Sequence, residues 1–145
     1  MNFFDAMQTS SSGLTAQRIR MNLISSNLAN ANTTKTEGGG PYKRKEPVFA
    51  AVPHEKGFNG VLQDTMDRSL SQVKVLNIVE DKRKPLTKYE PDSPEANAQG
   101  YIEMPNINVI EEMVNLMMAS RSYEANVTAI NATKKMAVKA LEIGK

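Results

Sequence analysis

Cysteine and tryptophan are absent from this sequence of 145 residues, and histidine occurs once, as His54. Without cysteine the chain can form neither a disulfide nor a thiolate metal site, and thiol catalysis is excluded. A structural zinc site is built mainly from cysteine and histidine, and a single histidine beside Glu55 does not supply that ligand set. A histidine base needs a positioned serine and an acid, which no pattern here indicates. We therefore interpret His54 as a surface residue, and we expect no catalytic residue, no cofactor and no metal.

Long apolar runs are missing as well. A membrane-spanning helix needs about 20 predominantly apolar residues in succession, and the sequence has no such run. The first residues, MNFFDAMQTSSSGL, lack the basic segment and the apolar segment of a secretory signal peptide. We expect no direct membrane insertion, and a location that is either cytoplasmic or reached by an export route without a cleaved signal peptide.

The sequence also lacks a strong excess of charge of either sign. Its 18 Lys and Arg residues against 16 Asp and Glu residues give a net charge of +2. The short basic runs at residues 43–45 and 82–84 are far from the broad basic face with stacking aromatics that binds nucleic acid, so we interpret them as solvated surface. Glu111 and Glu112 fall in the first turn of an expected helix, where carboxylates complement the helix dipole. The three glycines at 38–40 are not followed by the Lys-Ser/Thr pair of a phosphate-binding loop.

What the sequence does contain is helical periodicity at both ends. Residues 108–141 have no glycine or proline, and their seam positions recur in 4-3-4-3 steps, which is the pattern of a coiled coil. Such a helix would be roughly 50 Å long and could not bury its own stripe, so it requires partner helices. The seam is Val109, Met113, Leu116, Ser120, Tyr123, Val127, Ile130, Lys134, Ala137 and Leu141.

Residues 2–31 show the same periodicity, and we expect this second helix to end near Ala31. A kink or frayed turn is expected near Gly13, because three serines precede this glycine and glycine costs about 1 kcal/mol relative to alanine in a helix. Matching seams at the two ends predict an antiparallel helix pair. The N-terminal seam is Phe3, Met7, Ser10, Leu14, Gln17, Met21, Ile24, Leu28 and Ala31.

The middle of the chain is expected to be β-rich. Strand character is found at residues 48–52, 60–63 and 73–79, and a short last strand is expected at residues 101–104. After Pro105, either Asn106 or Asn108 can cap the C-terminal helix. The predicted fold is α+β, with long terminal helices forming an antiparallel coiled-coil-like pair and a small β-rich middle domain. The expected organisation is an N-terminal helix at 1–32, a connector loop at 33–45, an outer domain at 46–107 and a C-terminal helix at 108–145.

Several motifs resemble those of one protein family. SGLTAQ at 12–17 and NLANANTT at 27–34 resemble the N-terminal signature of bacterial flagellar rod and hook proteins. EMV at 112–114, SRSYEAN at 120–126 and ALEIG at 140–144 are similar to the matching C-terminal end. Within this family, the GGGPYKRK piece and YIEMPN at 101–106 are most similar to the proximal rod proteins.

This resemblance implies a structural, non-enzymatic subunit of the flagellar basal-body rod, the periplasmic drive shaft between motor and hook. The terminal helices would polymerise into its axial core, with other rod proteins and further copies of the chain as partners. The flagellar type III export apparatus would deliver the unfolded chain, and the terminal helices would become ordered on assembly. The expected subunit interface is Met7, Leu14, Met21, Ile24, Leu28, Asn30, Met113, Leu116, Ser120, Arg121, Tyr123, Asn126, Val127, Ile130, Ala137 and Leu141.

Three other interpretations stay open at this point. The helical periodicity also fits a non-flagellar helical assembly protein or a monomeric helical-hairpin adaptor whose ends pack on each other permanently. A small enzyme or ligand-binding domain using His54 would need a pocket in the middle region, which nothing in the sequence indicates.

Overall fold

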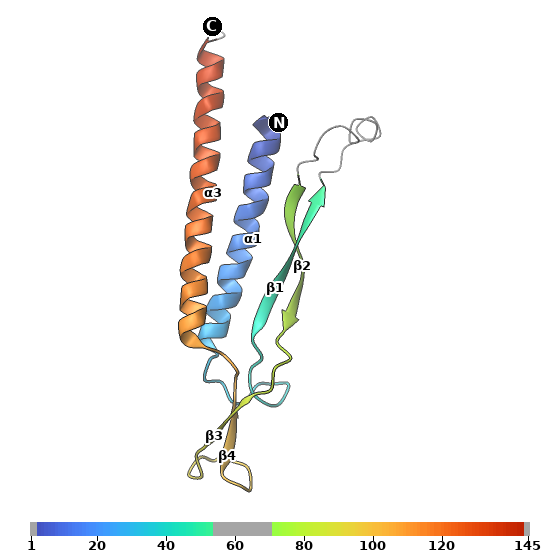
Figure 1. The fold of residues 1–145 in the computed structure, drawn as a ribbon, viewed down its shortest axis with the longest axis vertical. Helices are drawn as coiled ribbons and strands as arrows, with labels where there is room; N and C mark the ends of the chain where they lie inside the picture. Colours follow the sequence, from blue (N-terminus) through green and yellow to red (C-terminus); the bar gives the residue numbers. More distant parts are fainter. Residues whose placement is uncertain (1–2, 54–70, 144–145) are drawn as a thin grey trace.

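The computed structural model describes residues 3–53 and 71–143. Two long helices lie side by side, and two separate two-stranded antiparallel sheets are formed by the segment between them (Figure 1). The fold is therefore α+β with an antiparallel pair of terminal helices, as predicted. His54 and the predicted strand at 60–63 lie outside the described residues.

Helix α1 (Phe3–Ala29) and helix α3 (Val109–Ile143) run in opposite directions, so that α1 begins and α3 ends at the same end of the molecule (Figure 1). Of the two candidate caps for α3, the structure uses Asn108. Its side-chain oxygen accepts hydrogen bonds from the backbone N–H groups of Ile110, at 3.1 Å, and of Glu111, at 3.4 Å. This satisfies donors that have no partner within the helix.

Small residues bring the two helices together. Gly13 on α1 faces Asn126 on α3, and Ala119 on α3 is fully buried. The frayed turn expected near Gly13 is wrong, because α1 continues through this residue as one helix. A β-carbon at Gly13 would lie 3.0 Å from the side-chain nitrogen of Asn126. The glycine therefore costs local helix propensity but permits close approach of α3.

Strands β1 (Lys45–Pro53) and β2 (Ser71–Glu80) form a hairpin that lies along α1. Lys45 is opposite Glu80 at one end and Pro53 is opposite Ser71 at the other, with an irregularity at Val48. These strands contain the predicted segments 48–52 and 73–79. Helix α1 thus has α3 on one side and the hairpin on the other, which leaves only a narrow stripe of α1 exposed.

Strands β3 (Leu86–Tyr89) and β4 (Tyr101–Met104) form a second hairpin, which projects beyond the helix pair (Figure 1). The strand at residues 101–104 was predicted and is confirmed, whereas β3 was missed. All four residues of β3 are exposed, so no alternation of polar and apolar residues marked it. Among the described elements, no helix and no strand of the first hairpin packs against this second hairpin.

The hydrophobic core is small. The buried apolar residues of the described chain are Ala16, Ile24, Ala31, Ile102, Ile107 and Ala119. None of the described helices combines the length and the apolar character needed to cross a membrane. Within residues 3–53 and 71–143, no group of three or more His, Cys, Asp or Glu residues is placed to hold a metal ion.

Substitution of Gly13 tests the close contact between the helices. Gly13→Leu should lower the free energy of unfolding by about 1–3 kcal/mol, because the added side chain overpacks the contact with Asn126. Adding Asn126→Ala to Gly13→Leu should restore part of that loss. Gly38→Leu is the matched control, because nothing lies within 4 Å of a β-carbon at Gly38. Urea unfolding of the purified chain followed by far-ultraviolet circular dichroism gives the comparison; additive effects of the two substitutions would contradict the contact.

Candidate functional site

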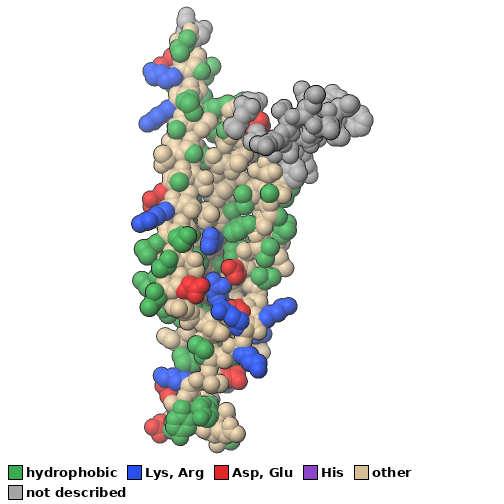
Figure 2. All heavy atoms as spheres, viewed as in Figure 1, with side chains coloured by type: hydrophobic (Ala, Val, Ile, Leu, Met, Phe, Trp, Pro, Cys, Tyr) green, Lys and Arg blue, Asp and Glu red, His purple; other side chains and the backbone are tan. Residues whose placement is uncertain are grey.

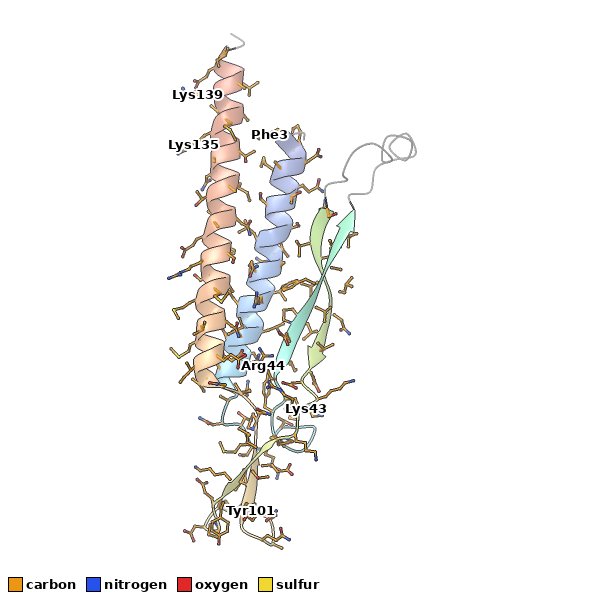
Figure 3. All side chains as sticks on the ribbon, in the orientation of Figure 1. Phe3, Lys43, Arg44, Tyr101, Lys135 and Lys139 are labelled. Atoms are coloured by element: carbon orange, nitrogen blue, oxygen red, sulfur yellow. The ribbon has the colours of Figure 1, made fainter. Side chains whose placement is uncertain are left out.

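A cluster of polar side chains lies at the end of the helix pair where α3 begins (Figure 3, near Arg44). The cluster consists of Asn27 from α1, Glu112 from α3, and Tyr42 and Arg44 from the connector, together with the backbone of Lys45. Asn27 and Glu112 are each only 1% exposed. We refer to these five residues as the polar cluster.

The side-chain amide of Asn27 has all of its hydrogen-bonding positions filled. Its nitrogen donates to the carbonyl oxygen of Lys45 at 2.9 Å and to Glu112 Oε2 at 3.2 Å. Its oxygen accepts from the backbone N–H of Lys45 at 2.9 Å and from the hydroxyl of Tyr42 at 3.1 Å. The amide thus pairs with the peptide groups of Lys45 much as a neighbouring strand would. Only a primary amide supplies two donors and two acceptors in this way.

The buried carboxylate of Glu112 is paired with a cation. Arg44 Nε donates to Glu112 Oε1 at 2.8 Å, and the arginine also reaches Glu46 Oε2 at 3.1 Å. Burial by itself would lower the pKa of Arg44, but the hydrogen bond and the charge of Glu112, with a further contribution from Glu46, raise it above its usual value. The guanidinium of Arg44 therefore stays charged beside Glu112, and pairing with a cation is how a buried carboxylate is tolerated in the interior.

A second anchor holds the β1–β2 hairpin to α1. The backbone N–H of Val73 donates to the hydroxyl of Ser12 at 3.1 Å. Ser12 and Asn27 are separated by about 22 Å along the helix axis at 1.5 Å per residue. Val73 is opposite Ala51 in the hairpin, and Lys45 to Ala51 spans about 20 Å of extended strand. The distance between the two anchors is therefore nearly the same along the helix as along the hairpin.

The structure corrects two sequence interpretations. Glu112 lies in the first turn of α3, but its carboxylate is buried against Arg44 and Asn27, so the helix dipole is not its main partner. Arg44 was assigned to solvated surface, yet only 15% of its side chain is exposed. Asn27 belongs to the NLANANTT motif, but the sequence did not predict its hydrogen-bonding role. The residues of this cluster lie far apart in the chain, so no local sequence pattern indicates that they come together.

A second feature of the site is an apolar surface on α3. The side of α3 that faces away from α1 carries, over its first turns, five apolar side chains that are 45–74% exposed. Figure 2 shows these hydrophobic side chains gathered along the outer edge of the helix. Further along the helix the same side carries charged residues, and Lys135 and Lys139 point away from α1 (Figure 3). We call the five residues the outer patch: Ile110, Met113, Val114, Met117 and Met118.

The expected interface residues fall into two groups. Within this chain Ile24 is buried, whereas Met113, Arg121 and Leu141 are exposed. The others are half-buried by the chain's own fold: Met7, Leu14, Met21, Leu28, Asn30, Leu116, Ser120, Tyr123, Asn126, Val127, Ile130 and Ala137. The expected interface therefore consists partly of residues that the α1–α3 pair already covers and partly of residues that face solvent.

Comparison with known proteins gives the class of the protein. Residues 7–35, which cover most of α1 and the start of the connector, match the family described as "Flagella basal body rod protein". Residues 98–143, which cover β4 and α3, match the family described as "Flagellar basal body rod FlgEFG protein C-terminal". Both matches fall on segments that carry the motifs.

Full-length relatives then define the family. The chain is 45% identical over 152 aligned residues to the flagellar basal-body rod protein FlgC of Bacillus subtilis, with all of both chains covered. It is 42% identical over 149 residues to FlgC of Borreliella burgdorferi, covering 99% of this chain and 98% of the relative. For FlgC of Salmonella typhimurium the identity is 39% over 146 residues, covering 99% and 97%. The chain belongs to the FlgC family of flagellar basal-body rod proteins.

Asn27→Asp tests the polar cluster. The substitution keeps the shape of the side chain but replaces the amide nitrogen by an oxygen, which would face the Lys45 carbonyl and the Glu112 carboxylate. We expect a loss of about 3 kcal/mol or more in the free energy of unfolding, because a buried charge is left beside two acceptors.

The control for this experiment is Asn22→Asp, the same substitution at an exposed position of the same helix. It should change the free energy of unfolding by less than about 0.5 kcal/mol. Urea unfolding at pH 7 measures both variants, and equal effects at the two positions would rule out the hydrogen-bonding role of Asn27.

Proposed function

We propose that this chain is a structural subunit of the bacterial flagellar basal-body rod and that it polymerises through its terminal helices into the periplasmic shaft that transmits torque from motor to hook. The observation that carries this proposal is the outer patch on α3. Large contiguous apolar surfaces are uncommon on proteins that act alone and mark places where another protein binds. Membership of the FlgC family supports the same conclusion.

The outer patch has a counterpart at the other end of the helices. Because α3 is 35 residues long and α1 only 27, the last turns of α3 extend past α1. A cleft lined by Phe3, Phe4, Met136, Ala137, Ala140 and Leu141 lies between the helix ends. Phe4 is 71% exposed and Leu141 is 76% exposed. In the proposed rod, helices of neighbouring subunits cover both the cleft and the outer patch.

This arrangement gives each part of the chain a role in the proposed assembly. Residues 1–32 and 108–145 would form the axial core, and residues 46–107 would face outward, joined by the connector at 33–45. The expected interface residues are proposed to contribute in two ways. Those that are exposed would contact neighbouring subunits, and those that are half-buried would be covered fully only in the assembly. Stiffness under torque would then come from many interlocked helices.

The proposed partners are further copies of this chain, other rod proteins and the flagellar type III export apparatus. Passage of an unfolded chain through an export channel requires that the fold be easily opened. The small core of the described residues supports this part of the proposal, because few side chains are withdrawn from water on folding. The proposed role is structural rather than enzymatic.

Met113→Asp tests the proposed function. This residue belongs both to the outer patch and to the expected interface, and it is 51% exposed within the chain. The substitution should therefore leave the free energy of unfolding of the purified chain nearly unchanged. In cells it should abolish motility and the incorporation of the chain into basal bodies, because each contact between subunits would bury an unpaired carboxylate.

Met113→Leu is the matched control and should preserve motility, since the volume and apolar character of the side chain are retained. Swimming in soft agar and the amount of the chain in purified basal bodies are the readouts. Normal motility of the Met113→Asp strain at normal expression would refute the proposed interface.

A further inference from the structure

The β1–β2 hairpin packs along α1, and hydrogen bonds between described residues join the two near Ser12 and near Asn27. At the Ser12 end, the backbone N–H of Val73 donates to the hydroxyl of Ser12 on α1. At the Asn27 end, the carboxylate of Glu112 joins the contact and binds both Asn27 and Arg44. Among the described elements, neither strand of this hairpin packs directly against α3. The polar cluster is therefore where the position of α3 acts on the docking of the hairpin.

The hydrogen bonds and charges of the polar cluster make the pairing of α3 with α1 and the docking of the hairpin on α1 depend on each other. If α3 were separated from α1, the second N–H of the Asn27 amide and the guanidinium of Arg44 would lose the carboxylate of Glu112. Arg44 is half-buried and would keep only the exposed carboxylate of Glu46, so the loss of Glu112 is costly. If the hairpin were instead to swing away from α1, Glu112 would be left buried without its cation. Each arrangement therefore stabilises the other.

We propose that Glu112 is a latch: the β1–β2 hairpin takes its fixed position along α1 only when α3 is paired with α1. The latch is a property of the single chain. If the proposed rod function is right, it also sets the orientation of the hairpin relative to the axial helices at the moment the helices pair. Because coupling between two events is reciprocal, docking of the hairpin stabilises the helix pair to the same extent.

Amide hydrogen exchange on the full chain, resolved by residue, tests the latch. The N–H groups of Lys45 and Val73 are the probes, because both donate to side chains of α1 and so report docking of the hairpin. In Glu112→Gln, both amides should exchange at least tenfold faster than in the unsubstituted chain. The helix-interior amides of Ala16 and Ala119 should accelerate less than those of Lys45 and Val73, because their backbone bonds lie within the helices.

Glu111→Gln is the matched control, since Glu111 is the exposed neighbouring carboxylate in the same turn of α3. It should leave the exchange of Lys45 and Val73 unchanged. Faster exchange of Lys45 alone would mean a local hydrogen bond and would overturn the latch. Equal acceleration of every amide would mean general loss of stability and would overturn it as well.

The unsubstituted chain supplies a second test that does not depend on how well the variant folds. If α1 and α3 are unprotected in the purified chain, the latch requires Lys45 and Val73 to be unprotected too, and protection of those two amides on unpaired helices would overturn it. Protection of all four sites together supports it. This readout is separate from motility, so failure of the latch and failure of the rod function can be told apart.

Discussion

The structure depends on the pairing of one buried carboxylate, that of Glu112. A buried charge needs a counter-ion and hydrogen-bond donors, and here they come from distant parts of the chain. Arg44 in the connector supplies the cation, and Asn27, 85 residues earlier in the sequence, supplies an amide N–H. The same amide is bound to the backbone of Lys45, where β1 begins. One polar cluster therefore fixes the relative positions of both terminal helices and the first hairpin.

Around this cluster, the usual distribution of side chains is partly reversed. The contact between the helices includes small and polar residues such as Gly13, Ala119 and Asn126 beside half-buried apolar residues, whereas the outer patch of α3 is apolar and exposed. A chain with a small core has little stability to spare. Covering the outer patch with neighbouring helices would supply the missing burial, which is the physical reason to regard the single chain as an unfinished part of an assembly. The spacing of Ser12 and Asn27 keeps the hairpin aligned with α1 independently of that assembly.

Features encoded locally could be predicted from the sequence, and features that depend on tertiary contacts could not. The 4-3-4-3 periodicity predicted both helices, supported in the C-terminal one by the absence of glycine and proline, and residues that favour strands predicted the strand around Val75. Strand β3 was missed because it is short and exposed throughout. The low helix propensity of Gly13 predicted an irregularity, whereas in the structure the missing side chain leaves room for Asn126 of α3. Glu112 and Arg44 carry ordinary surface signatures, and only the fold brings them together.

The most direct test of this account is a double-mutant cycle on Arg44 and Glu112, measured by urea unfolding of the full chain. Arg44→Met should lower the free energy of unfolding by about 3 kcal/mol or more, because it leaves the buried carboxylate of Glu112 without its cation. Glu112→Leu should lower it by a smaller amount, because Arg44 is only half-buried and keeps Glu46. The double variant should lose roughly 2 kcal/mol less than the sum of the two single losses, since neither charge then remains. Additive losses would contradict the account, because the two residues would then act independently and the polar cluster would not be what joins the helices to the hairpin.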